Sequence, residues 1–259
     1  MLICALSRAV LMAAILSATP ALADETAPPG DFTFSGSVSA VSQYRFRGIA
    51  QSDNKPAVQG AVTLSHASGF YVSAWASSAQ AGSSAVNIGG SELDIYGGYT
   101  HEIGTSGVAV DLGLYGYLYP GASSGNLYEV YGSLAKTYGP FTAKLGVNYA
   151  PAQHVFSGVG AATRSNTYVY GELGGGIPGT PITLHSHLGH TGGGFNYTKP
   201  YLDYSVGATA KWKALSFDLS LIGTNVSHAD AARAPLAASP FETWRAAKSV
   251  VVAAISFSF

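Results

Sequence analysis

The residues of this sequence that could take part in binding or catalysis are charged residues and histidines. They occur singly within segments in which polar and apolar residues alternate. In the segment from Val108 to Leu114, the even-numbered positions are aliphatic and Asp111 is at an odd-numbered one. In a strand, Asp111 would therefore point to the opposite face from the aliphatic residues; we call this odd or even position the parity of a residue. A charge is costly against lipid but is tolerated in a water-filled interior. Parity and loop position together select twelve candidates for a pore lining: Arg45, Arg47, Glu92, Asp94, Asp111, Glu129, Lys144, His185, His187, Asp203, Lys211 and Asp218.

The charge balance of these candidates leaves ion selectivity open. Without Arg47 and the histidines, the set holds six acids and three bases, which favours cations. Arg45 and Arg47 share one parity next to a mouth, where they would attract anions. An ion pair between these arginines and an inward acid such as Asp94, holding a loop, is an equally good interpretation.

The pair His185 and His187 places two imidazoles on one face of a predicted strand. A metal site needs further ligands, so two histidines alone are a weak signal. We expect them to be polar residues of the lining, and we predict neither a metal nor a cofactor.

Two patterns invite a search for catalysis. Gly121–Gly125 matches G-x-S-x-G, but this motif has meaning only on a strand-to-helix turn, and in this sequence it fills a loop between strands. His66 and Ser68 superficially suit an outer-membrane phospholipase, yet the predicted topology puts them in a periplasmic turn, away from the outer leaflet. We therefore predict that the protein is not an enzyme and keep a lipid hydrolase as a weak alternative.

The composition is unusual for a soluble domain. Only 10% of the 259 residues are charged, against roughly 25% in soluble proteins, while there are 16 Tyr and 32 Gly. No segment after the N-terminus has the 18 or more consecutive apolar residues of a membrane helix. The formal charge of −1 excludes a strongly basic nucleic-acid binder. These features are typical of a transmembrane β-barrel.

The N-terminus predicts a secretory signal peptide. Arg8 precedes an apolar stretch, and Ala21-Leu22-Ala23 offers a cleavage site before Asp24. The apolar stretch is too short to cross a bilayer. The only cysteine, Cys4, lies within the signal, so a mature chain of residues 24–259 has neither a disulfide nor a reactive thiol.

Alternating segments of about ten residues are the elements that position the candidate residues. There are twelve: Phe32–Arg45, Ala57–Ser65, Phe70–Ser77, Glu92–Thr100, Val108–Leu118, Leu127–Tyr138, Phe141–Tyr149, Thr167–Gly175, Pro181–His190, Tyr201–Trp212, Leu215–Thr224 and Lys248–Phe259. An even number suits a closed antiparallel barrel. Short and long connections follow one another in turn, which is typical of barrels with short periplasmic turns and long extracellular loops.

The strand ends carry many aromatic residues, which predicts two girdles at the two membrane interfaces. One girdle, on the loop side, comprises Tyr44, Tyr117, Tyr119, Tyr128, Tyr149, Tyr168, Tyr170 and Tyr201. The other, on the turn side, comprises Phe32, Phe34, Phe70, Tyr138, Phe141, Trp212, Phe257 and Phe259. In the last long loop, Ser239, Pro240 and Glu242 provide a helix start, but we favour a surface loop there.

The stretch from Ser42 to Gly60 carries a specific resemblance. Its run Y-R-F-R-G-I-A-Q-S-D-N-K-P-A-V-Q-G, together with Gly69-Phe70-Tyr71 before Trp75 and the Glu92–Tyr99 strand, resembles the TorF-type porin family. This family is also catalogued as Gcw_chp, bacterial proteins of unknown function. The resemblance covers essentially the whole mature chain and implies an outer-membrane barrel with a passive pore, without naming a solute.

Together these features predict an all-β protein, a closed antiparallel transmembrane barrel of about twelve strands in the bacterial outer membrane. We expect a passive pore for small polar solutes, with lipid and the barrel-assembly machinery as partners, the latter through the strand that ends at Phe259. A barrel with a filled lumen, serving structure or surface recognition, is the main alternative. The sequence leaves the oligomeric state open.

Overall fold

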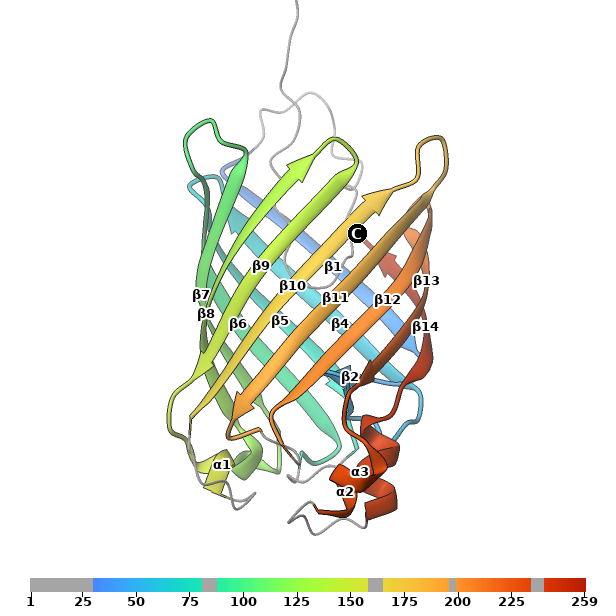
Figure 1. Cartoon of the computed structure of the whole chain (residues 1–259). Helices are drawn as coiled ribbons and strands as arrows, with labels where there is room; N and C mark the ends of the chain where they lie inside the picture. The colour runs from blue at the N-terminus through green and yellow to red at the C-terminus, as the bar shows by residue number, and fades with distance from the viewer. Residues whose placement is uncertain (1–29, 81–87, 158–164, 196–198, 234–239) are drawn as a thin grey trace, which may run out of the picture.

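The computed structural model of the chain describes residues 30–80, 88–157, 165–195, 199–233 and 240–259, and it forms a closed β-barrel (Figure 1). Every strand of the barrel is antiparallel to both of its neighbours, and β1 closes the barrel by pairing with β4 on one side and β14 on the other. The twelve barrel strands are β1 (Phe32–Val41), β4 (Ala57–His66), β5 (Phe70–Ser78), β6 (Ser91–Glu102), β7 (Val108–Leu118), β8 (Leu127–Tyr138), β9 (Phe141–Ala150), β10 (Asn166–Gly176), β11 (Ile182–Gly193), β12 (Tyr201–Trp212), β13 (Leu215–Thr224) and β14 (Val250–Ser258). The predicted fold is confirmed.

Four of the twelve predicted strands have the observed bounds, seven differ by one to three residues at an end, and the first strand is the main exception. The bounds of β7, β8, β12 and β13 are those expected. Strand β1 ends at Val41, not at Arg45, because the chain leaves the wall there and forms a separate hairpin of β2 (Arg45–Phe46) and β3 (Ile49–Ala50). The prediction that Arg45 and Arg47 point to one face of the first strand is therefore wrong, because neither residue belongs to that strand.

The two ends of the barrel differ (Figure 1). One end, the turn end, has the short connections, such as Gly139-Pro140 and Lys213-Ala214. The other, the loop end, has the longer connections and carries η1 (Ser123–Gly125), α1 (His154–Ser157), α2 (His228–Ala232) and α3 (Pro240–Ala247). Helix α3 shows that the helix signal was correct and that the surface loop preferred there was wrong. None of the described helices is long and apolar enough to cross a bilayer.

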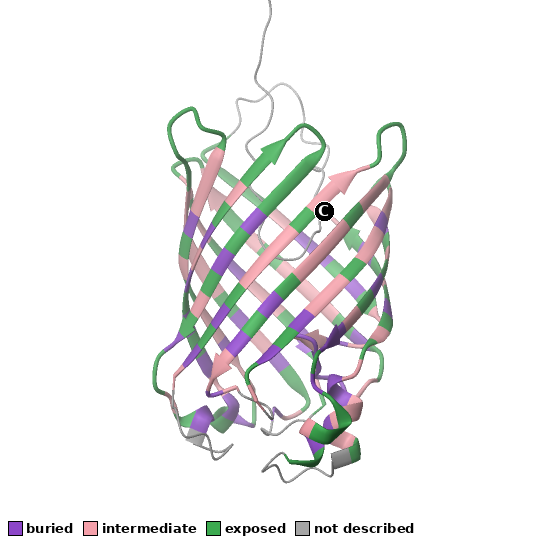
Figure 2. Cartoon of the chain, viewed as in Figure 1, coloured by how far each residue is buried: buried purple, intermediate pink, exposed green. Residues whose placement is uncertain are grey.

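Side chains alternate between the two faces of the wall, as bands of burial along each strand show (Figure 2). On β7, Leu112 and Leu114 are exposed, whereas Asp111 next to them is buried. On β13, Phe217, Leu219 and Leu221 are exposed, and Ser216 and Ser220 are buried. The apolar residues thus form the outer face, and the polar residues face inward.

The aromatic residues of the turn end form an exposed girdle as expected: Phe32, Phe34, Phe70, Tyr138, Phe141, Trp212, Phe257 and Phe259 are all exposed. The girdle predicted for the loop end is largely wrong. Tyr128 and Tyr149 are exposed, but Tyr117, Tyr168 and Tyr201 are buried because they have inward parity on their strands. These rings belong to the interior.

The predicted signal peptide, residues 1–23, lies outside the described residues.

Candidate functional site

The candidate functional site is the barrel interior together with residues 42–56, which connect β1 to β4 and are called L1. Within L1, Arg47 (φ 46°) and Gly48 (φ 77°) form the two-residue turn between β2 and β3. Positive φ at both central residues is the geometry of a tight hairpin with the right-handed twist of its strands. A Cβ atom at position 48 would lie 2.8 Å from the carbonyl oxygen of Gly223, so glycine is required at the tip.

At the tip of L1, Arg47 forms a buried ion pair with Glu129 of β8. One of its terminal guanidinium nitrogens donates to both carboxylate oxygens, at 2.7 and 2.8 Å. The guanidinium carbon also lies 4.1 Å from the ring centre of Tyr168 on β10. Burial acts to lower the pKa of Arg47, but the Glu129 carboxylate together with Tyr117 and Tyr168 outweighs it, so the pKa is raised. Because β8 lies on the side of the barrel opposite β1, L1 crosses the interior.

Arg45 has a different environment from Arg47, contrary to the shared lining role predicted for them. Its guanidinium donates to the carbonyl oxygens of Gly48, Ala246 and Lys248 at 2.7–3.0 Å. Burial lowers the pKa of Arg45 to about 10. Arg45 thus joins L1 to the end of α3 and does not point at the site of Glu129.

Two apolar clusters hold L1 in place at the loop end. Ile49 and Ala50 pack in one cluster with Tyr201, Val226, Ala246 and Ala247. Phe46 packs against the other, which comprises Tyr117, Leu127, Ala150, Val155 and Phe156. The loop is therefore anchored by apolar burial on both sides of the ion pair at its tip.

Inside the wall, four candidate carboxylates each accept a hydrogen bond from a tyrosine hydroxyl. The pairs are Tyr115 to Asp94 (2.9 Å), Tyr71 to Asp111 (2.9 Å), Tyr117 to Glu129 (3.2 Å) and Tyr168 to Asp203 (3.0 Å). Sequence reasoning missed these tyrosines as interior residues. Their parity was the available signal, because Tyr115 and Tyr117 lie two residues apart from one another on the same face of β7 as Asp111.

Both predicted histidines, on β11, pair with acids: His187 with acids on the adjacent strands β10 and β12, and His185 with an acid on β13, one strand further along the wall. The Nε2 atom of His185 is 2.7 Å from Asp218 Oδ2, while His187 lies between Glu172 (3.3 Å) and Asp203 (3.1 Å). Glu172 was not among the predicted residues, although it shares the inward parity of Tyr168 and Tyr170 on β10. Among the residues that the structure describes, no group of three or more His, Cys, Asp or Glu is arranged to hold a metal ion.

The two predicted lysines lie on different parts of the wall. Lys144 on β9 is buried, with its ammonium nitrogen 5.4 Å from the ring centre of Tyr170. Lys211 is half-buried near the turn end of β12. Glu92, the remaining candidate, is buried at the loop end of β6 next to Asp94.

The inner wall is asymmetric in its side-chain sizes. Strands β5 to β8 and β10 carry inward tyrosines, whereas β13, β14 and β1 carry buried serines on their inward faces. On this serine arc, the Ser39 hydroxyl donates to that of Ser256 at 2.8 Å across the pair that closes the barrel. Because serine is small, the side chains of this arc narrow the interior less than tyrosines do.

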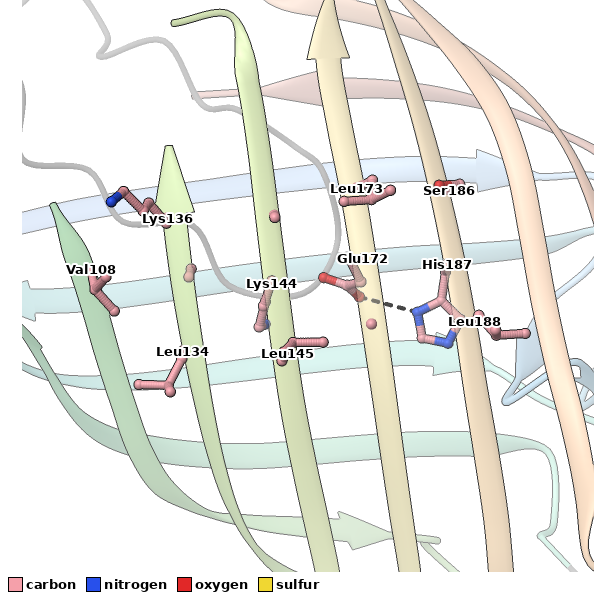
Figure 3. A pocket seen from close by; sticks show the side chains of 13 residues that line it. Val108, Leu134, Lys136, Lys144, Leu145, Glu172, Leu173, Ser186, His187 and Leu188 are labelled. Carbon is pink, nitrogen blue, oxygen red and sulfur yellow. Dashed lines mark hydrogen bonds and ion pairs between the residues drawn. The ribbon is translucent and has the colours of Figure 1, made fainter. Parts of the chain in front are cut away.

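A separate groove of about 700 Å³ crosses strands β7 to β11 on the wall (Figure 3). Its margins include Leu145, Leu173 and Leu188, which are exposed and point away from the interior. Lys144 and Glu172 also border it, but alternation directs their side chains to the other side of the wall. We assign the groove to the outer apolar face.

The residues of the weak hydrolase alternative lie at the turn end. His66 Nδ1 and Ser68 Oγ are 2.7 Å apart, and the same nitrogen accepts a hydrogen bond from the backbone N–H of Ser68 at 3.1 Å. This contact closes the β4–β5 turn. It is a local turn contact, on the side of the barrel away from L1.

A closed twelve-stranded barrel with an apolar outer face and a polar interior is a protein of the porin type. The chain belongs to the family described as "Bacterial protein of unknown function (Gcw_chp)", whose model matches residues 25–257. No curated protein matches the chain.

Solved structures with the same fold include two porins. The KdgM porin is 13% identical, with a TM-score of 0.56 over 87% of this chain and 99% of that one. A structure titled "KdgM porin in complex with disordered oligogalacturonate" gives the same values. The NanC porin is 11% identical, with a TM-score of 0.53 over 86% of this chain and 98% of that one. At these identities the likeness concerns the fold.

Proposed function

We propose that the protein is a passive pore for small polar solutes in the bacterial outer membrane. The observation that supports this most is the closed barrel with charged and hydroxyl side chains on its inner wall and leucines on its outer wall. Twelve tilted strands at about 4.8 Å spacing give a backbone diameter of roughly 24 Å, which leaves room for a small solute but not for a folded protein.

The pore prefers cations to anions. Of the two arginines that argued for anions, Arg45 is turned toward α3, and Arg47 and Glu129 neutralise one another. Glu172 adds a further acid to the inner wall. A carboxylate-rich interior repels anions, so we do not carry the oligogalacturonate of the KdgM structure, a sugar acid, over to this chain.

L1 sets the open area at the loop end. It reaches across the interior to β8, and the apolar clusters and the Arg47–Glu129 pair hold it there. Solutes pass L1 in one of two ways: along the serine arc while L1 is docked, or through the wider opening that forms when L1 moves aside. We take the loop end as extracellular and the turn end as periplasmic.

Export and assembly follow the same proposal. Residues 1–23 serve as the signal peptide, and residues 24–259 make up the barrel in contact with outer-membrane lipid. The segment that barrel-assembly machinery recognises is β14 with the following residue, Phe259.

Planar-bilayer recordings of the purified protein test the pore. We expect conductance steps, and we expect liposomes that contain the protein to swell in small neutral sugars more than in larger ones. The main alternative is a barrel whose lumen stays filled, which the contacts of L1 across the interior favour. Absence of both conductance and swelling would establish that alternative.

A further inference from the structure

Two neighbouring carboxylates beneath L1, Glu92 and Asp94, have no cationic partner in the part of the chain that the structure describes. Glu92 is 1% exposed and Asp94 is 2% exposed, at the loop end of β6. The hydroxyls of Tyr44 and Tyr119 lie beside Glu92, but no donor of a described residue has the distance and angle of a hydrogen bond to either Glu92 oxygen or to Oδ1 of Asp94. The side chain of Asp94 accepts one hydrogen bond, from Tyr115. Among the described residues, no Lys, Arg or His forms an ion pair with either acid, whereas Glu129, Glu172, Asp203 and Asp218 each have one.

The two side chains are placed to share one ligand. They are two residues apart on one strand, so they point to the same face with their Cα atoms about 7 Å apart. The phenol groups of Tyr44 from L1 and Tyr119 beyond β7 lie close enough to interact electrostatically with Glu92. Burial raises the pKa of Tyr44 well above its usual value, and the Glu92 carboxylate adds to this rise, so Tyr44 presents a neutral hydroxyl.

A buried carboxylate without a partner costs several kcal/mol unless a cation or a proton neutralises it. The polar groups named beside the pair are tyrosine hydroxyls, from Tyr44, Tyr115 and Tyr119, so this set of possible ligands consists of oxygen atoms. Oxygen-only donor sets select hard cations, and two negative charges match one divalent ion. We propose that Glu92 and Asp94 bind a hard divalent cation beneath L1, with calcium as the ion used to test the site.

This cation site is separate from the charge selectivity proposed for the pore. It is a buried position at the loop end that holds an ion under Tyr44, whereas selectivity arises from the whole inner wall. Because Tyr44 belongs to L1, a bound cation stabilises the docked position of the loop. The proposal depends on ion binding alone, so it stands or fails apart from any conductance.

The test is calcium binding to the refolded, metal-free full-length barrel in detergent at pH 7.5, followed by calorimetry. Extracellular calcium modules bind with a dissociation constant of about 10⁻⁴–10⁻³ M, and we expect one site in this range. In Glu92→Gln/Asp94→Asn, both charged ligands are lost, and binding should weaken by at least about tenfold. The matched control is Asp111→Asn, which removes another buried inward acid that has a tyrosine partner, and it should bind calcium like the wild type.

Thermal unfolding gives a second measurement on the same proteins. Calcium should raise the melting temperature of the wild type and of Asp111→Asn, and it should leave that of the double variant unchanged. If the double variant does not fold, Glu92→Gln alone takes its place. Failure of the wild type to bind calcium, or equal binding by the double variant, overturns the proposal. The first outcome would show that a shared proton neutralises the pair.

Discussion

Arg47 and Glu129 form an ion pair across the barrel interior, between residues that are 82 positions apart in the chain. Their side chains are only 5% and 0% exposed, and the N–O distance is 2.7 Å. Glu129 also accepts hydrogen bonds from Tyr117 and from the side-chain amide of Asn148. The Glu129 carboxylate therefore has both its ion pair and its hydrogen bonds only while L1 is docked.

Replacing Arg47 should release L1. In Arg47→Met, Glu129 stays buried without its cation, which typically costs about 3–5 kcal/mol when a buried pair is broken. Because undocking L1 lets water reach Glu129, we expect the variant to show larger single-channel conductance than the wild type. Recordings in planar bilayers measure this difference.

The double variant Arg47→Met/Glu129→Leu is the matched control for that experiment. Replacement of both partners by apolar residues is often neutral, so L1 should stay docked and conductance should remain near the wild-type value. Equal conductance of Arg47→Met and the wild type would show that the ion pair does not hold the loop.

The contrast between the barrel wall and L1 shows what the sequence can predict. Alternation with a period of two is a local property, so it predicted strands such as Val108–Leu118 to the residue and the inward side of Asp111. The end of β1 was missed because nothing local distinguishes a strand that continues from one that leaves the wall at Val41. The turn at Arg47 depends on distant residues, Glu129 and Gly223, which no short pattern contains.

The interior tyrosines were missed for a different reason. Tyr117 and Tyr168 lie near strand ends, where membrane proteins often carry aromatic girdles, and this tendency was given more weight than parity. The structure follows parity, because a ring of inward parity can donate its hydroxyl to a carboxylate on the adjacent strand or on the strand beyond it. Parity was also sufficient to find Glu172, and it should be applied before any rule about strand ends.

The contact between Asp53 of L1 and Arg245 of α3 should make loop docking sensitive to acid. Partial burial acts to raise the pKa of Asp53, but hydrogen bonds from Arg245 and Lys55 outweigh it and lower the pKa. A lowered pKa means that the contact stabilises docking above the free value of about 3.9 and is lost as the pH falls below it. We expect constant conductance from pH 7 to pH 5 and an increase below about pH 4.

Asp53→Asn identifies the group responsible for this response, because Glu242 also contacts Arg245 and titrates at acidic pH. The variant keeps the size of the side chain but cannot titrate, so its conductance should lack the acid-dependent step that the wild type shows. A step of the same size in Asp53→Asn would assign the response to another carboxylate.

The acid-rich inner wall should make the pore cation-selective. With a potassium chloride gradient across the bilayer, the reversal potential should correspond to preferred passage of potassium. Asp111→Asn removes one inward charge and keeps a hydrogen-bond acceptor for Tyr71, so it should shift the reversal potential toward zero. Lys136→Gln, which changes a charge on the outer face, should leave it unaltered. A preference for chloride in the wild type would refute this assignment.

Leucines of the outer face should tolerate truncation but not charge. Leu114 is 66% exposed near the middle of β7. In lipid, Leu114→Arg should lower the free energy of unfolding by about 2–4 kcal/mol, the cost of an arginine at the bilayer midplane. Leu114→Ala should cost less, because it introduces no charge. Urea unfolding in liposomes measures both, and equal losses would mean that position 114 does not contact lipid.

The end of the chain should matter both for closing the barrel and for its assembly in cells. The backbone of Phe259 exchanges two hydrogen bonds with Gly36, at 2.9 and 3.0 Å, and so extends the pairing of β14 with β1. A Cβ atom at position 36 would lie 2.5 Å from the Phe259 ring and 3.0 Å from the carbonyl oxygen of Ala61. A larger side chain at position 36 must therefore displace the last residue.

Two variants separate these roles. Phe259→Ala keeps the backbone pairing, so the purified protein should refold in detergent, as heat-dependent migration in gels would show. In cells, its assembly into the outer membrane should fall if machinery recognises the terminal aromatic ring. Gly36→Val disturbs the closing pair itself and should impair refolding and assembly alike. Normal assembly of Phe259→Ala would show that the ring contributes only to the girdle at the turn end.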